Sequence, residues 1–176
     1  MQDIIANLDA DQTEILRLHR VWWIANHGVD IPAMRTVFPG GDDQYLMYNL
    51  NLHPYFGLEE KTKLWEYYSD KLELFHTEVW VHRIDVSGDL AYLACEGVWN
   101  AKRGDETEVK WHPVRATEVY RRDDGDGNPV WKMWHFHCSL RAEPDALRPG
   151  FGDTYADRGV GYLPYPGAFR SLPVED

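Results

Sequence analysis

The sequence predicts a single α+β domain in which helices come first and an antiparallel sheet follows. Through most of the first 72 residues, apolar side chains recur at the three- and four-residue spacing of amphipathic helices. From residue 73 onward the period changes to two, and turn sequences rich in Gly and Asp interrupt it. The 176 residues, 44% of them hydrophobic, suffice for one domain with its own core. This order favours a strongly curved sheet that wraps around the helices.

Three helices are predicted in the first part of the chain. Residues 11–26 carry an apolar stripe, and Asp11 and Glu14 are spaced like a capping box. Asp30 can cap a second, short helix that has a proline in its first turn. Residues 58–72 form the third helix, with one charged face. Its other face is a stripe of Lys61, Leu64, Trp65, Tyr68 and Leu72.

Strands account for most of the remaining chain. QYLMYNLN, residues 44–51, alternates like a short strand before the third helix. The turn sequences SGD, KRGDE and DDGDGNP then separate four long antiparallel strands. These strands cover roughly residues 73–86, 90–101, 108–122 and 130–141. We assign residues 1–142 to the domain and 143–176 to a Pro, Gly and aromatic tail, which is either a lid over a pocket or a loose end.

Charge and cysteine content narrow the class of protein. The formal net charge of −11 opposes the phosphate attraction that drives nucleic-acid binding, and it also disfavours anionic membrane surfaces. No basic start, apolar signal region or membrane-spanning stretch is found, so we expect a cytoplasmic protein. Cys95 and Cys138 are too few for a disulfide framework and are expected to be reduced structural thiols.

Side-chain alternation assigns the two faces of the predicted strands. In the last strand, WKMWHFHCSL, we expect His135 and His137 to point inward. Trp134 and Phe136 then point outward, where large exposed rings are unusual for a monomer. We therefore predict a homodimer through the convex face of the sheet.

Several motifs occur in an order that resembles the SnoaL-like branch of the NTF2-like superfamily. They are WIANHGVD with the following Met and Phe, HPYFG, SGDLAYL, VRATEVYRR and WKMWHFHCS. The resemblance covers about residues 10–140 and implies a cone of three helices and a bent sheet, usually dimeric, with a pocket inside. The superfamily includes ketosteroid isomerases, scytalone-type dehydratases, polyketide cyclases and ligand-binding proteins.

The resemblance implies roles for several side chains. His53, before Pro54, stands where ketosteroid isomerases carry their Asp-Pro general base. Arg115 falls near the oxyanion donor of the isomerases, and a guanidinium there would stabilise an oxyanion or phenolate. His76 resembles the catalytic histidine of the dehydratases, and Asn26 lies near their early aspartate.

Strand alternation adds further candidates for a pocket. It places His76 and Glu78 on the inward face of the first long strand, and Arg115 on that of the third. Histidines near neutrality exchange protons readily, and aromatic rings suit an aromatic substrate. The candidate catalytic residues are His53, His76, Arg115 and His137. The candidate substrate-binding residues are Asn26, Tyr48, Tyr55, Glu78 and Trp111.

Two other interpretations of the histidines stay open. A single buried histidine most often only satisfies hydrogen bonds. His135 and His137 could also be a metal pair completed by His76, His82 or Glu78, although the resemblance is to a mostly metal-free family. Without a nucleotide-binding fingerprint, we expect chemistry that needs no metal and no cofactor.

The aromatic pocket suits a phenolic substrate and general acid-base chemistry. We predict a cofactor-independent lyase similar to the diarylpropane (γ-formaldehyde) lyases of lignin catabolism. These remove water and formaldehyde from a bis-aromatic diol through a quinone methide and leave a stilbene. Arg115 would stabilise the phenolate, His53 or His76 would protonate the departing hydroxyl, and His137 would take the proton of the terminal alcohol. The alternatives are a dehydratase, isomerase or polyketide cyclase for a polycyclic substrate, and a protein that only binds an aromatic ligand.

Overall fold

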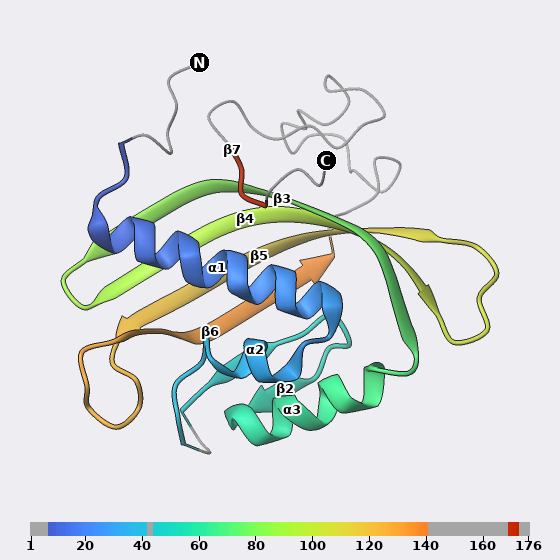
Figure 1. Ribbon diagram of the computed structural model, residues 1–176, viewed down its shortest axis with the longest axis horizontal. Helices are drawn as coiled ribbons and strands as arrows, with labels where there is room; N and C mark the ends of the chain where they lie inside the picture. The colour runs from blue at the N-terminus through green and yellow to red at the C-terminus, as the bar shows by residue number, and fades with distance from the viewer. Residues whose placement is uncertain (1–6, 42–43, 141–168, 173–176) are drawn as a thin grey trace, which may run out of the picture.

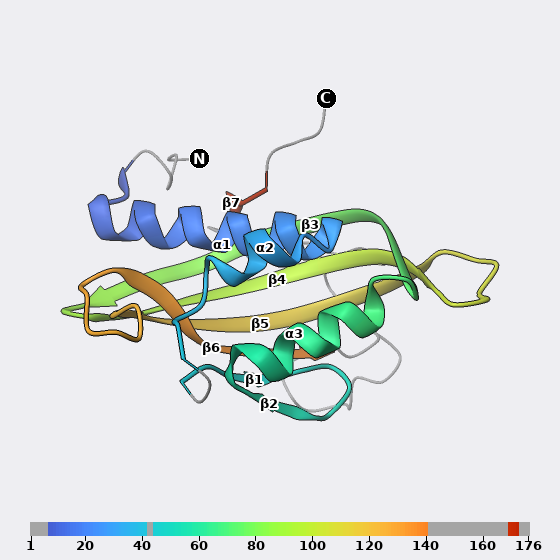
Figure 2. The same ribbon diagram turned by 60° about the horizontal axis from the view of Figure 1, so that its bottom comes forward.

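Helices cover the concave face of one large, curved sheet that does not close (Figure 1). The computed structural model describes residues 7–41, 44–140 and 169–172. The three helices are α1 (Ala10–Gly28), α2 (Ile31–Arg35) and α3 (Gly57–Tyr68). The strands are β1 (Leu46–Tyr48), β2 (Pro54–Phe56), β3 (Leu72–Ser87), β4 (Leu90–Arg103), β5 (Lys110–Arg122), β6 (Trp131–Leu140) and β7 (Phe169–Arg170). The predicted α+β class is confirmed, as Figure 2 also shows from a second direction.

Capping side chains fix the starts of the first two helices. The Asp9 carboxylate accepts a hydrogen bond from the Gln12 amide at 2.8 Å, and the Gln12 side chain accepts one from the Asp9 amide at 3.1 Å. This capping box lies two residues before the predicted one, so α1 begins earlier than expected. The Asp30 carboxylate accepts from the Ala33 amide at 3.0 Å, as predicted for α2.

The sheet has the order β2-β1-β6-β5-β4-β3-β7. Its four long strands are the predicted ones, and each pairs antiparallel with the next. Two short strands were not predicted: β2 pairs with β1, and β7 pairs with β3. β1 runs parallel to β6, with Met47 opposite Phe136. The predicted tail lies outside the described residues except for residues 169–172.

A β-bulge in β6 reverses the predicted faces of its last residues. Val119 pairs with His135 and Tyr120 with Met133, so Trp134 is the extra residue. Phe136 is therefore fully buried, with its ring 5.3 Å from that of Trp22 in α1. The predicted inward orientation of His135 and His137 is wrong, and so is the outward orientation of Phe136, because the extra residue shifts the alternation by one.

The faces of β3 and β5 also differ from the prediction. Val79 and Val81 are fully buried beneath the helices, which places His76 and Glu78 on the outer face of β3. In β5 the buried positions are Val114, Ala116, Glu118 and Tyr120, and Arg115 therefore points outward. The residue types misled the prediction because both faces of β5 carry polar as well as apolar side chains.

Candidate active site

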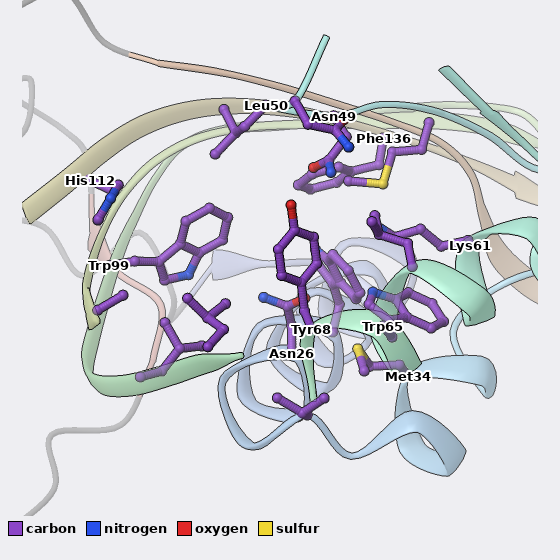
Figure 3. Close-up of a pocket in the computed structure, with 18 of the residues that line it drawn as sticks. Asn26, Met34, Asn49, Leu50, Lys61, Trp65, Tyr68, Trp99, His112 and Phe136 are labelled. Carbon is purple, nitrogen blue, oxygen red and sulfur yellow. The ribbon is translucent and has the colours of Figure 1, made fainter. Parts of the chain in front are cut away.

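A cavity of about 280 Å³ lies between α1, α3 and the concave face of the sheet (Figure 3). Its volume is close to the lower end of small-molecule sites, which run from about 300 to 1,000 Å³. The polar and aromatic side chains that matter for its chemistry are Asn26, Lys61, Trp65, Tyr68, Trp99 and His112. We call this cavity the inner pocket.

Lys61 is the central ionisable group of the inner pocket. Its side chain comes from α3 and is 2% exposed. Its Nζ lies 5.4 Å from the centre of the Tyr55 ring and 5.3 Å from that of Trp65. Among the described residues it forms no ion pair with a carboxylate. Burial without such a partner lowers the pKa of Lys61 from its usual 10.5 to about 7, so a large share of the amine is neutral at neutral pH.

The start of α3 sets the position of this lysine. Gly57 has a φ of 75°, a conformation that a side chain would strain, and it lets the chain turn from β2 into the helix. The Glu60 carboxylate accepts a hydrogen bond from the Phe56 amide at 2.6 Å. Lys61, Trp65 and Tyr68 then follow at the spacing of one helix face, which is directed toward the sheet.

Two indole nitrogens at the inner pocket lack a hydrogen-bond acceptor among the described residues. Within the part of the chain that the structure describes, Trp65 Nε1 and Trp99 Nε1 are buried without a hydrogen-bond partner. An indole N–H can only donate, and buried donors are rarely left unpaired. Figure 3 shows the nitrogen edge of Trp65 on the side of the Tyr68 ring, whose hydroxyl is directed toward Asn49. A carbonyl or oxyanion on a ligand would give these donors an acceptor.

A second pocket, of about 410 Å³, lies next to the inner one. We call it the outer pocket; Tyr48, His53 and His137 are among the residues that line it. The Tyr48 ring contacts the His137 ring edge-on, with 5.7 Å between centres. The two pockets share Asn49, Leu50 and Leu140.

Apart from the two pockets, a cluster of polar side chains is buried in the core. His19 and Glu118 are 0% exposed, and Nδ1 of His19 lies 3.0 Å from the carboxylate. Nε2 of His19 lies 2.8 Å from Oγ of Ser171. The Glu118 carboxylate also accepts from Trp23 Nε1 at 2.8 Å and from the Tyr120 hydroxyl at 2.6 Å. Cys95 lies near enough to complete a three-ligand metal set with His19 and Glu118, but these atoms already bond one another. We interpret this cluster as structural.

Residues 15–143 match the SnoaL-like domain. The chain belongs to this family. The predicted resemblance to the SnoaL-like branch of the NTF2-like superfamily is thereby confirmed.

Solved structures share the fold of this SnoaL-like domain. A ketosteroid isomerase-like protein from Erwinia carotovora atroseptica SCRI1043 has a TM-score of 0.65 and 13% identity, over 77% of this chain and 100% of that chain. An NTF2-like superfamily protein from Salmonella enterica serovar Typhimurium LT2 has a TM-score of 0.64 and 16% identity, over 81% of this chain and 96% of that chain. A proposed dehydratase of the NTF2-like family from Streptomyces avermitilis has a TM-score of 0.58 and 20% identity, over 77% of this chain and 99% of that chain. At these identities the likeness concerns the fold alone.

Two further findings complete the comparison. No curated protein matches the sequence. None of the helices in the described part of the chain is both long and apolar enough to cross a membrane.

The predicted site residues of the SnoaL-like domain fall into separate places. Asn26 lines the inner pocket, and Tyr55 lies beside it, where its ring faces Lys61 and its hydroxyl accepts from Asn51 at 2.7 Å. Tyr48, His53 and His137 line the outer pocket.

His76, Glu78 and Arg115 lie on the outer face of the sheet. His76 is exposed and pairs with Glu78 at 3.0 Å, and Glu78 also pairs with Arg170 at 3.1 Å. Arg115 pairs with Glu96 at 3.1 Å. The prediction that His76, Glu78 and Arg115 point into the cavity is therefore wrong. Trp111 lies on β5 opposite Asn100, and its side chain is outside the described part of the structure.

The sequence analysis predicted the helix face that carries Lys61, Trp65 and Tyr68 but assigned it no role in the site. The only signal was a lysine in an otherwise apolar and aromatic stripe. A lysine at such a position commonly extends its amine to solvent, so the stripe alone did not mark a site. The predicted homodimer through the convex face stays a prediction, now without Phe136 in its interface.

Proposed function

We propose that this SnoaL-like domain is an enzyme that transfers protons on a small ring-bearing substrate in the inner pocket, as dehydratases and isomerases do. The observation that carries the proposal is the enclosed amine of Lys61, which has no acidic partner among the described residues and a pKa of about 7. A group with such a pKa can both accept and return a proton at neutral pH, and neither step requires a cofactor.

The rest of the inner pocket supports this assignment. Proton removal beside a carbonyl leaves negative charge on its oxygen. The N–H groups of Trp65 and Trp99, which have no partner among the described residues, can donate to that oxygen. The Asn26 amide and the Tyr68 hydroxyl supply further polar contacts. Aromatic walls stack on a ring, and the volume of about 280 Å³ favours one ring or two fused rings.

Formaldehyde loss from a bis-aromatic diol is the second candidate. The outer pocket favours it, because this pocket carries His53 and His137 and shares Asn49, Leu50 and Leu140 with the inner pocket. One ring of a diarylpropane could occupy each pocket. The third candidate function is binding of an aromatic ligand without catalysis.

Deuterium uptake separates these candidates. The full chain is incubated in D₂O with 2-tetralone or 4-chromanone, and exchange of the α-protons is followed by NMR. A bis-phenolic diarylpropane diol is tested in parallel for release of formaldehyde. We expect the wild type to exchange the α-protons faster than buffer alone does. Lys63→Met, whose lysine is exposed on the same helix, should do the same, whereas Lys61→Met should not. Formaldehyde release without ketone exchange would favour the second candidate, and quenching of tryptophan fluorescence without turnover would favour a binding protein.

A further inference from the structure

The inner pocket combines a nucleophile with the groups that a carbonyl addition needs. We propose that Lys61 acts covalently: its amine attacks an aldehyde or ketone carbon and forms an iminium, so the substrates are carbonyl compounds. The inference rests on the proposed function and names its substrate class. It adds a bond between protein and substrate that proton transfer alone does not require.

The geometry comes from one face of α3. Lys61, Trp65 and Tyr68 are separated by four and three residues, so their side chains lie along one stripe. Lys61 is 2% exposed and Trp65 is 4% exposed. Figure 3 shows the end of Lys61 and the nitrogen edge of Trp65 on one side of the cavity, with the Tyr68 ring across from them and its hydroxyl directed toward Asn49. A carbonyl compound in this cavity can therefore place its carbon beside Lys61 and its oxygen toward a donor of the same lining, Trp65 or Tyr68.

The groups that face Lys61 leave its lone pair available. β2 contributes the Tyr55 ring, and α3 itself contributes the Trp65 ring. β6 contributes the Cys138 thiol, whose pKa burial raises to about 12, so the thiol is neutral at neutral pH. No carboxylate of the described residues approaches the amine to hold a proton on it. A desolvated lysine of this kind is a typical nucleophile toward carbonyl groups.

The proposed reaction needs only water and protons. The lone pair of Nζ forms a C–N bond, the carbonyl π pair moves to oxygen, and one proton passes from nitrogen to oxygen. The resulting carbinolamine takes up a proton and loses water, which leaves the iminium. For a β,γ-unsaturated carbonyl compound, loss of a proton from the α-carbon gives a dienamine, and protonation at the γ-carbon moves the double bond into conjugation with the iminium. Hydrolysis then returns the amine and the isomerised carbonyl compound.

The surroundings match the charges that arise in these steps. Trp65 Nε1, which has no acceptor among the described residues, can donate to the oxygen while the carbinolamine forms. The iminium is cationic, and the Tyr55 and Trp65 rings, at 5.4 and 5.3 Å from Nζ, favour a cation. The Tyr68 hydroxyl can protonate the departing oxygen.

Reductive trapping tests the proposal. The full chain is incubated with 2-tetralone or cinnamaldehyde and sodium cyanoborohydride, and the peptides are mapped by mass spectrometry. We expect a mass increase equal to the probe less one oxygen atom, at least tenfold more frequent on Lys61 than on the exposed Lys63. Labelling of Lys61 should rise as the pH passes through about 7, and Lys63→Met should leave it unchanged.

The outcomes separate this proposal from the proposed function. Labelling of Lys63 and other exposed lysines without Lys61 overturns the covalent step, and the wild type alone decides this even if Lys61→Met folds poorly. Proton exchange that depends on Lys61 but gives no adduct also overturns it and leaves proton transfer intact. An adduct on Lys61 without turnover supports the covalent step and counts against the proposed function.

Discussion

His19 and Lys61 are both buried groups that can ionise, and they differ in their partners. His19 is 0% exposed, and its two nitrogens lie 3.0 Å from Glu118 and 2.8 Å from Ser171. Lys61 is 2% exposed and faces aromatic rings, with no acid beside it in the described part of the chain. A buried polar group with full pairing stabilises the fold, whereas one without pairing costs stability and is retained for another reason. The comparison therefore separates the structural cluster from the site.

The largest expected effect is on turnover when Lys61 is replaced. Lys61→Met keeps the length of the side chain and removes its proton-accepting amine. Because a positioned acid-base group contributes about 10²- to 10⁴-fold, kcat should fall by that factor. The kcat is measured with the substrate that proton exchange identifies, and Lys63→Met, on the exposed side of α3, is the matched control. A Lys61→Met enzyme with more than a tenth of the wild-type kcat would remove Lys61 from the mechanism.

Glu118→Gln should affect stability rather than turnover. The carboxylate accepts from Trp23 and Tyr120 and lies beside His19, so an amide in its place leaves unmatched donors. Breaking a buried pair of this kind costs about 3 to 5 kcal/mol. Urea unfolding measures the loss, and Glu66→Gln, on the exposed surface of α3, should stay within about 0.5 kcal/mol. If the folded Glu118→Gln protein lost turnover as Lys61→Met does, the core cluster would not be merely structural.

Titration of Lys61 should make the free energy of unfolding depend on pH. Its pKa is about 7 in the folded chain and 10.5 when unfolded, so the unfolded chain binds the extra proton between these values. The free energy of unfolding therefore falls as the pH drops from about 10 to 7 and levels off below 7. Relative to Lys61→Met, the wild type should lose about 3 kcal/mol between pH 9.5 and 7. Parallel stability curves for the two proteins would show that the lysine titrates normally.

The sequence predicted the fold better than the site, for identifiable reasons. The change of period after residue 72 and the turn sequences located the four long strands, because both signals are local. Which side chains of β6 point inward depends on the bulge at Trp134, and no glycine or turn residue in the sequence indicates this bulge. The sequence shows Lys61 in its stripe, but the burial of its amine depends on two strands. β2 was not predicted, and β6 lies far from Lys61 in the chain. A short strand such as β2 offers too few residues for alternation to be recognised.

Trp65→Phe should have a smaller effect on turnover than Lys61→Met. The change keeps an aromatic ring beside Lys61 and removes an N–H that has no partner within the described structure. One neutral hydrogen bond contributes about 1 kcal/mol, so kcat should fall by roughly fivefold to tenfold. Trp131→Phe is the control, because that N–H donates to Asp11 at 3.0 Å and lies outside the inner pocket. Equal kcat values for the Trp65 and Trp131 variants would mean that the Trp65 N–H contacts no substrate oxygen.

The smallest expected effect is that of His137→Ala. The bulge turns this exposed side chain to the outer face, where it contacts the Tyr48 ring with 5.7 Å between centres. Exposed substitutions usually change stability by less than about 0.5 kcal/mol, and turnover in the inner pocket should stay within about twofold. His135→Ala is the informative comparison, because its half-buried ring donates from Nδ1 to the Leu46 carbonyl at 3.0 Å and ties β1 to β6. That loss should lower the free energy of unfolding by about 1 kcal/mol. A hundredfold fall in kcat for His137→Ala, with unchanged thermal unfolding, would move the reaction to the outer pocket and favour the diarylpropane substrate, which needs His137 and not Lys61.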